Sequence, residues 1–334
     1  MKIGILAITD GGKRLAADLA ARMPLSLLLP HEAGVGQALA EHWPKMDGFV
    51  CIMAAGIVAR AIAPLLHDKA SDPCVVVVDE KGRHAISLLS GHLGGGNDLA
   101  RRVAALCGGQ AVITTASDTL GLAPLDLWAR AQNLVCESRE GLRQASARLV
   151  NTGHLTIFSE VAVVSLPPGL AAVAGPELAD IVVSSRIADY GAAVVFRPRN
   201  MVVGVGCNRG VPVAELRQAC EELFGEQGLS QLSIRNLASI DLKRDETGLA
   251  AFAAEKDLRI DFFSKEELNR VADVAVSEAA LRAVGAVGVA EPAALLSAQS
   301  NDLLVGKRKW RNVTMAVARA NCTLSEQDLA LQNI

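Results

Sequence analysis

The residues best suited to chemistry lie in one short glycine-rich segment, residues 90–97, which reads SGHLGGGN. It follows an apolar, strand-like run and precedes a stretch with helical periodicity. Glycine lets the backbone come close to a ligand, and free N–H groups at the start of the following helix favour an anion. Such a seat suits a ligand carboxylate or the oxyanion that forms when a carbonyl is attacked. The residues expected to bind there are Gly91, Gly94, Gly95, Gly96 and Asn97, with Asn97 or Asp98 capping the helix.

The same loop has less specific interpretations. A glycine-rich turn that serves only close packing has a similar composition. The loop is not a dinucleotide fingerprint, because GxGxxG is absent at the required place, and it is not a Walker A loop, because no Gly-Lys-Ser/Thr follows. These two absences count against a third class of function, a nucleotide-binding α/β regulator.

Three side chains in or near this loop are candidates for catalysis. His92 can act as a general base on water or as an acid on a leaving alkoxide; a hydrogen-bonded structural histidine is the alternative. Ser90 can donate to a substrate carbonyl, but no GxSxG elbow surrounds it, so it is a weak nucleophile. Asp118, in the later segment TTASD, is a candidate base, and a turn-forming role is its alternative.

The elements that must position these residues alternate between strand and helix. Apolar strand-like runs cover residues 2–8, 48–53, 74–79, 85–88 and 111–114. Helix-like patterns cover residues 12–22, 56–65 and 97–107. This alternation predicts an N-terminal, mainly parallel α/β domain over residues 1–120.

A parallel sheet binds ligands at the carboxyl edge of its strands, which predicts further site residues. Gly56 and Arg60 open the helix after the second of these runs and are expected at the same edge as the glycine-rich loop. Arg60 either pairs with a ligand carboxylate or is solvated. Thr114 and Thr115 are expected to complete that edge, whereas the polar loop 67–72 is expected at the opposite edge with a structural role.

The rest of the chain predicts two further α/β parts. Residues 121–199, broken by several prolines and glycines, read as a small α/β middle region. Residues 200–320 restart with a strand at 201–206 and an amphipathic helix at 212–224, which predicts a separate C-terminal α/β domain. The tail, residues 321–334, is expected to be frayed.

The C-terminal part carries a second group of binding candidates. They follow expected strand ends or form part of a short basic run, and they are Gly206, Asn208, Arg209, Lys243 and Lys307. A helix start near Arg209 makes a second anion seat. Basic runs are usually solvated faces, but a ligand with several carboxylates would make this one a binding surface.

Composition excludes several classes of function. The chain has 334 residues, with 33 Lys+Arg against 36 Asp+Glu, so a bulk nucleic-acid or membrane binder is not expected. The long apolar run at residues 48–66 contains Arg60 and Pro64, which favours a strand, a turn and a helix over a membrane span. The whole chain has seven cysteines and no CxxC pair, so we expect neither a disulfide framework nor a metal site. Free cysteines fit a cytoplasmic protein, and Cys207 is expected to be a packing residue.

Three parts of the chain together closely resemble the cobalt-precorrin-5A hydrolase family, often called CbiG, of anaerobic cobalamin biosynthesis. They are residues 56–118, residues 203–210 (VGVGCNRG), and a set of segments within 239–319 that includes SIDLKRDETGL and VSEAALRAVGAVGVAEPAAL. The most specific motif is SLLSGHLGGGN, and the middle region matches more loosely. Residues 307–312 read KRKWRN, where the family would have a more glycine-rich stretch.

The resemblance implies a reaction. Water opens the lactone of cobalt-precorrin-5A, a ring-contracted cobalt tetrapyrrole, and the former meso carbon leaves with its methyl as acetaldehyde. Cobalt would come with the substrate, so no cofactor is implied. His92 and the glycine-rich loop would serve the first step, and the C-terminal domain would grip the rest of the macrocycle.

The resemblance also bears on partners. They would be the corrinoid substrate and neighbouring enzymes of the pathway, with no nucleic acid and no membrane, and the oligomeric state is left open. A non-catalytic corrinoid-binding carrier is the alternative function, against which the whole N-terminal part argues.

Overall fold

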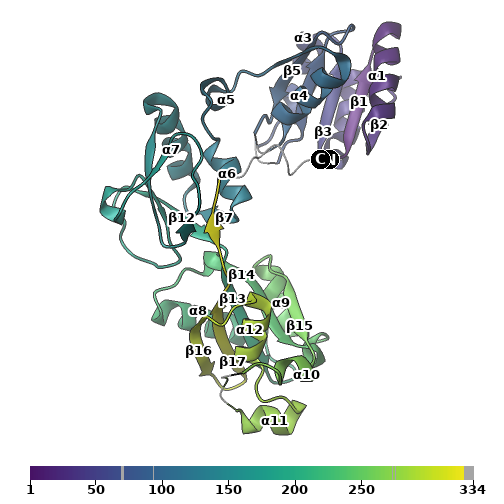
Figure 1. The fold of residues 1–334 in the computed structure, drawn as a ribbon. Helices are drawn as coiled ribbons and strands as arrows, with labels where there is room; N and C mark the ends of the chain where they lie inside the picture. Colours follow the sequence, from purple (N-terminus) through teal and green to yellow (C-terminus); the bar gives the residue numbers. More distant parts are fainter. Residues whose placement is uncertain (69–70, 93, 273, 275, 327–334) are drawn as a thin grey trace. The chain divides into compact units, whose positions relative to one another are not determined.

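The computed structural model describes residues 1–68, 71–92, 94–272, 274 and 276–326 (Figure 1). Its described residues divide into two compact units, residues 1–128 and residues 129–326. The described residues form a six-stranded sheet in the first unit, and two five-stranded sheets and one two-stranded sheet in the second. The expected α/β class is thereby confirmed. No helix in the described ranges is long and apolar enough to cross a membrane.

The first unit is built on one sheet with the order β2-β1-β3-β4-β5-β6. Its strands are β1 (Ile3–Ala7), β2 (Ser26–Leu28), β3 (Gly48–Ile52), β4 (Cys74–Val78), β5 (His84–Leu89) and β6 (Gln110–Val112). The neighbouring strands β2, β1, β3 and β4 pair in parallel, and so do β5 and β6. Strands β4 and β5 are antiparallel, because the turn of residues 79–83 between them is too short for a parallel crossover.

Helices cover both faces of this sheet, which explains the continuous apolar run of β4. The helices of the unit are α1 (Asp10–Arg22), α2 (Val35–His42), α3 (Ala55–Ile62), α4 (Gly96–Cys107), α5 (Ala116–Leu120) and α6 (Leu125–Ala131), which crosses into the second unit, with 3₁₀ turns at Trp43–Lys45 and Ala63–Leu65. Leu19 of α1 and Val103 of α4 belong to the core on one face. Leu39 of α2 and Val58 of α3 belong to the core on the other face. Alternate valines of β4 belong to each.

The direction of β5 overturns one expectation about the site. Because β5 runs against β3 and β4, its end at Leu89 lies beside Val75, at the start of β4. The glycine-rich loop therefore lies at the opposite edge of the sheet from Gly56 and Arg60, which follow the end of β3. The expectation that they share an edge is wrong.

The first sheet of the second unit has the order β10-β8-β11-β12-β7. Its strands are β7 (Leu134–Cys136), β8 (Leu155–Ser159), β10 (Leu170–Ala172), β11 (Ile181–Val183) and β12 (Val194–Pro198), accompanied by α7 (Arg139–Thr152) and a 3₁₀ turn at Pro176–Leu178. Pairs are parallel except β7 with β12. Arg197 of β12 is buried and donates to the carbonyl oxygens of Ser184 and Arg186.

The other five-stranded sheet of this unit has the order β15-β14-β13-β17-β16, with β17 antiparallel to both neighbours. Its strands are β13 (Met201–Cys207), β14 (Ile234–Ile240), β15 (Ile260–Phe263), β16 (Leu303–Lys309) and β17 (Val313–Arg319). Its helices are α8 (Val213–Glu226), α9 (Thr247–Glu255), α10 (Lys265–Leu268), α11 (Glu278–Val284) and α12 (Ala290–Ala298), with 3₁₀ turns at Gln231–Ser233 and Asp241–Lys243. Helix α12 packs tightly on β13, since a Cβ on Gly204 would lie 1.8 Å from the carbonyl oxygen of Ala290.

The start of the tail is ordered, which corrects the expectation of a frayed end. Strand β18 (Thr323–Leu324) pairs in parallel with β9 (Ala162–Val163), and Ala320 N donates to the carbonyl of Asn200. The part of the expected tail from residue 327 to 334 lies outside the described residues.

Candidate active site

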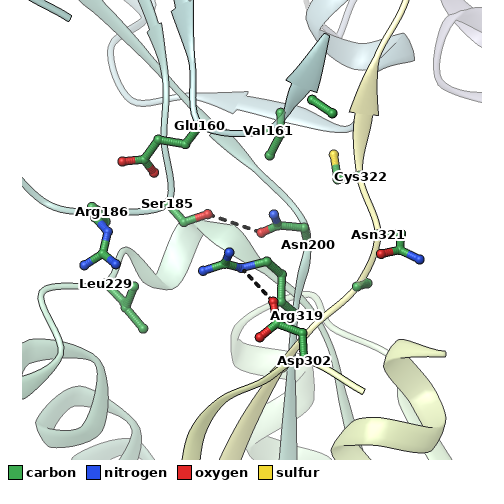
Figure 2. Close-up of a pocket in the computed structure, with 12 residues that line it drawn as sticks. Glu160, Val161, Ser185, Arg186, Asn200, Leu229, Asp302, Arg319, Asn321 and Cys322 are labelled. Atoms are coloured by element: carbon green, nitrogen blue, oxygen red, sulfur yellow. Dashed lines mark hydrogen bonds and ion pairs between the residues drawn. The ribbon is translucent and has the colours of Figure 1, made fainter. Parts of the chain in front are cut away.

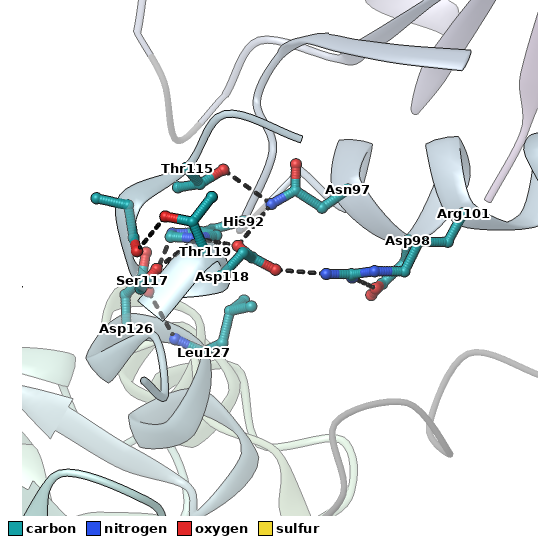
Figure 3. A network of polar contacts seen from close by, with 11 residues as sticks. His92, Asn97, Asp98, Arg101, Thr115, Ser117, Asp118, Thr119, Asp126 and Leu127 are labelled. Carbon is teal, nitrogen blue, oxygen red and sulfur yellow. Dashed lines mark hydrogen bonds and ion pairs between the residues drawn. The ribbon is translucent and has the colours of Figure 1, made fainter. Parts of the chain in front are cut away.

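A polar network joins the loop after β5 to the segment after β6 (Figure 3). The two strands are parallel neighbours, with Ile86 beside Val112, so their ends lie at the same edge of the sheet. His92 comes from the first segment, and Ser117 and Asp118 come from the second. The candidates of these two segments were expected to lie together, and the structure does bring them into contact.

His92 is the centre of this network. Its Nε2 lies 3.1 Å from Asp118 Oδ2 and 3.2 Å from Ser117 Oγ. Its Nδ1 faces a different carboxylate, Asp126 Oδ1, at 3.9 Å. A carboxylate only accepts hydrogen bonds, so the short contact with Asp118 places a hydrogen on Nε2. In the neutral imidazole, Nδ1 is then the basic nitrogen.

Asp118 is held firmly in position. Asn97 Nδ2 donates to its Oδ2 at 2.9 Å, and Arg101 donates to its Oδ1. The Nδ2 of Asn97 also donates to Thr115 Oγ1 at 3.0 Å. Because Asn97 is buried at 4% exposure, it fixes the carboxylate that in turn fixes the histidine ring.

The N–H groups at the start of α4 are used inside the loop itself. Gly95 N donates to the carbonyl of His92, Gly96 N to that of Ser90, and Asn97 N to that of Gly91. These three N–H groups, which were expected to be free to bind an anion, therefore already donate to carbonyl oxygens of the loop. The cap prediction is also wrong: Gly95, with φ +78°, occupies the N-cap, and the side chain of Asn97 turns toward Asp118 instead.

The glycines of the loop allow its backbone to lie close to other atoms of the same loop and of α4. A Cβ on Gly91 would lie 2.6 Å from Asn97 Oδ1, and one on Gly94 would lie 2.5 Å from Ser90 Cβ. A Cβ on Gly96 would lie 2.8 Å from the carbonyl oxygen of Leu89. The loop is thus rich in glycine at least in part because its backbone packs closely against neighbouring atoms.

Ser90 is engaged away from His92. Its Oγ donates to the carbonyl of Asp72 at 3.1 Å, and its backbone has the unusual φ of +51°. The same contact shows that the loop containing Asp72 lies beside Ser90. This loop precedes β4 and so lies at the edge opposite Gly56 and Arg60, as expected; the glycine-rich loop is the one found at an unexpected edge. Thr114 is exposed.

Asp126, at the start of α6, is the member of the network that sequence reasoning missed. It lies eight positions beyond Asp118, in the segment LDLWARA, after the expected end of the domain at residue 120. A carboxylate close behind the TTASD segment was the available signal. Only the turn through α5 brings it to the imidazole of His92.

Gly56 and Arg60 border a different region. Arg60 donates to the carbonyl of Gly56 at 2.9 Å within α3. A cavity of about 600 Å³ lies at the carboxyl ends of β1, β3 and β4, where α/β sheets commonly bind ligands. Its lining is mostly apolar, with Ile57 from α3 and the polar residues Thr9, Asp79, Glu80 and His84.

The C-terminal candidates largely have partners within the protein. Asn208 donates to Asn312 Oδ1 at 3.0 Å, and the NH1 of Arg209 lies 2.7 Å from both carboxylate oxygens of Asp245. Lys243 is buried, with Nζ 3.6 Å from Glu246. These residues and Gly206 follow or end β13 and β14, which are parallel neighbours, so they share one edge.

Lys307 and Cys207 complete the C-terminal candidates. The backbone N–H of Lys307 in β16 donates to Glu291 Oε1 at 2.8 Å. Burial raises the pKa of the Cys207 thiol to about 11, so it is a thiol at neutral pH, as a packing residue would be.

A second cavity, of about 260 Å³, lies in the second unit and has no counterpart among the expected sites (Figure 2). Ser185, Asn200, Asp302 and Arg319 are among its lining residues, and Arg319 Nε lies 3.7 Å from Asp302. Ser185 Oγ donates to Asn200 Oδ1 at 3.2 Å. Its polar lining combines both signs of charge.

Comparison with known proteins gives two family matches. The model described as "Cobalamin synthesis G N-terminal" matches residues 37–118, and "Cobalamin synthesis G C-terminus" matches residues 201–318. The network of His92 and Asp118 falls inside the first match, and Asp126 lies just beyond it.

Individual relatives agree with these matches. A "Cobalt-precorrin-5A hydrolase" of Priestia megaterium is 36% identical over 304 residues, which cover 85% of this chain and 81% of the relative. One of Salmonella typhimurium is 30% identical over 345 residues, covering 96% and 98%. A crystal structure of a cobalamin biosynthesis protein G homologue from Sulfolobus solfataricus is 22% identical, with a TM-score of 0.39, and the match covers 95% of this chain and 96% of that one.

Proposed function

The chain belongs to the cobalamin synthesis G family, and from this premise we propose that it hydrolyses the lactone of cobalt-precorrin-5A and releases acetaldehyde to give cobalt-precorrin-5B. The observation that carries the proposal is the arrangement of His92. One ring nitrogen is bound to a fixed carboxylate, Asp118, and the other is left as a base.

The first step is attack of water on the lactone carbonyl. His92 Nδ1 takes a proton from the water while Asp118 holds the Nε2–H and stabilises the imidazolium that forms. The hydroxide oxygen bonds to the carbonyl carbon, and the lactone C–O bond then breaks. The resulting alkoxide is the leaving group, and it remains on the former meso carbon.

The second step is cleavage of a carbon–carbon bond. The alkoxide oxygen forms a carbonyl, the bond to the ring carbon breaks, and acetaldehyde departs. The electron pair passes into the macrocycle, which takes up a proton later. The substrate supplies the electron sink, so the protein needs only to bind and orient it.

We propose binding roles for the remaining candidates. The edge with Gly91, Gly94, Gly95, Gly96, Asn97, Thr114 and Thr115 would receive the lactone, with Ser90 beside it. The C-terminal edge with Gly206, Asn208, Arg209, Lys243 and Lys307 would meet the peripheral carboxylates of the macrocycle. Gly56 and Arg60 do not line the apolar cavity at the other edge of the first sheet, but their neighbours Ala55 and Ile57 do. We propose that they act beside this cavity, which suits a face of the macrocycle rather than the reacting lactone.

We further propose that cobalt comes with the substrate, that no other cofactor takes part and that the reaction occurs in the cytoplasm. The seven free cysteines support a reducing compartment. Neighbouring enzymes of the pathway are the candidates to deliver the substrate and accept the product.

The test is direct. The purified protein is incubated anaerobically with cobalt-precorrin-5A, and acetaldehyde is measured. Loss of a general base lowers rates by about 10²–10⁴-fold, so His92→Ala should lose activity by that order. The matched control is His154→Ala, an exposed histidine in the second unit. Corrinoid binding without acetaldehyde in the wild type would instead identify a carrier.

A further inference from the structure

The two ring nitrogens of His92 face two different carboxylates, and only one of these contacts is a hydrogen bond. Nε2 lies 3.1 Å from Asp118, whereas Nδ1 lies 3.9 Å from Asp126 Oδ1 (Figure 3). A separation of 3.9 Å is too long for a direct hydrogen bond. It is a distance that one bridging water can span with a hydrogen bond to each side.

The carboxylate of Asp126 accepts fewer hydrogen bonds from the described residues than the carboxylate of Asp118 does. Asp118 receives hydrogen bonds from Asn97 and Arg101 besides the histidine. Within the described chain, Asp126 Oδ1 lies near His92 Nδ1 and accepts a hydrogen bond from the N–H of Leu127 at 2.9 Å. The side chain of Asp126 is 23% exposed, so a ligand or a water can reach it.

We infer that Asp126 is a further catalytic residue, which holds the nucleophilic water against His92. The water donates one hydrogen to Nδ1 and the other to Asp126. Both hydrogens are then directed at the protein, and a lone pair of the water faces outward. That orientation is the one needed for attack on a carbonyl carbon brought to the open side.

The roles of the two acidic residues are therefore different. Asp118 fixes the ring and its tautomer through Nε2, and it acts through His92 as a positioning residue. Asp126 touches the reacting water itself. When Nδ1 takes one proton, the second hydrogen stays on the new hydroxyl and Asp126 remains its acceptor, so Asp126 changes neither charge nor proton count in this step.

This inference rests on the proposed lactone hydrolysis, and the experiment separates the two. Wild type, Asp126→Asn, Asp126→Ala and the control Asp10→Asn are compared over a range of cobalt-precorrin-5A concentrations up to saturation. Asp10 is the matched acidic residue, with a side chain 93% exposed on α1. Thermal unfolding and substrate binding are measured on each variant, and Asp126→Asn preserves the side-chain volume.

The expected result is a fall of kcat by about 10²-fold in Asp126→Ala, which no longer orients the water, with little change in KM. The fall should be smaller in Asp126→Asn, because its amide oxygen can still accept a hydrogen bond from the water. Added formate should restore part of the kcat of Asp126→Ala in a saturable way, because it can occupy the vacated carboxylate position. Undiminished kcat in Asp126→Ala, or an Asp126→Ala variant that formate does not restore, would overturn the assignment. A wild-type protein that releases no acetaldehyde would overturn the proposed function instead.

Discussion

Asn97 and Asp118 are joined by a hydrogen bond of 2.9 Å between Nδ2 and Oδ2, across 21 positions of sequence. The donor is buried at the first turn of α4, and the acceptor lies in α5 after the neighbouring strand. The bond links the segments that follow β5 and β6 into one structure. The position of His92 depends on it, because Asp118 receives Nε2–H through the same oxygen that accepts from Asn97.

Replacing Asn97 should therefore disturb both stability and activity. Asn97→Asp places a second carboxylate against Asp118, and we expect the free energy of unfolding to fall by about 1–3 kcal/mol, as for a buried polar group that loses its partner. Acetaldehyde release should fall with it, because Asp118 no longer holds the ring. Chemical denaturation and the anaerobic assay measure the two effects. Asn301→Ala, at an exposed position, is the control.

Gly91 should not tolerate a methyl group. Its Cβ would lie 2.6 Å from Asn97 Oδ1, so Gly91→Ala must push Asn97 away from Asp118. We expect a loss of about 1–3 kcal/mol in unfolding free energy and a lower kcat. The matched change Gly36→Ala, in α2 where nothing lies within 4 Å, should instead be neutral or stabilising by up to about 1 kcal/mol. Equal stability of the two variants would contradict the packing argument.

Ser90 and Ser117 offer a comparison of two hydroxyls near the histidine. Ser90→Ala loses the bond to the Asp72 carbonyl, which should cost about 1 kcal/mol of stability and leave kcat close to that of the wild type. Ser117→Ala removes the hydroxyl 3.2 Å from His92 Nε2 and should alter kcat more. A folded Ser90→Ala variant without activity would show that Ser90 acts on the substrate, as the sequence suggested.

Because of its buried thiols, the free energy of unfolding should depend on pH in the alkaline range. Burial raises the pKa of Cys51 from 9.0 to about 12, because the thiolate is poorly solvated in the core. The folded state thus keeps the proton longer than the unfolded state does. The resulting stability is complete below pH 9 and is lost as pH rises toward 12.

The corresponding measurement is the free energy of unfolding between these two pH values. One such thiol contributes a slope of about 1.4 kcal/mol per pH unit. Cys51→Ala should show a shallower decline than the wild type at alkaline pH. Parallel curves for the two proteins would refute the contribution of this thiol.

Removal of free metal should leave the activity unchanged. The proposal places the cobalt in the substrate, so treating the purified enzyme with a chelator before the assay should not lower acetaldehyde release. Metal analysis of the protein before substrate is added gives the control. Activity that falls with the chelator and returns with one added metal would refute the proposed absence of a protein cofactor.

Much of the fold could be predicted from the sequence, because apolar runs such as Cys74–Val78 and the helical pattern of α4 report local burial directly. The direction of β5 was missed, although the short turn DEKGR already requires an antiparallel pair. Because of that one error, Gly56 and Arg60 were predicted at the same edge as His92, whereas the structure has them at the opposite edge.

The candidate site was predictable in part. His92 and Asp118 were singled out by residue type and neighbourhood, and the structure brings them into contact. Which nitrogen of His92 faces which carboxylate follows from the turn of α5 and the start of α6, and tertiary positions of this kind leave no periodic signal in the sequence. The same holds for Ser90, whose hydroxyl donates a hydrogen bond to the carbonyl of Asp72, 18 positions earlier in the sequence.

The ordered tail has a consequence for the architecture of the second unit. Met201 at the start of β13 lies directly opposite Arg319 at the end of β17, so the sheet of residues 201–319 begins and ends at neighbouring points. The chain then returns to pair β18 with β9, beside the preceding sheet. Residues 201–319 are thus arranged as an inserted module: they could be excised and the gap closed by a short linker, with the host sheet left continuous.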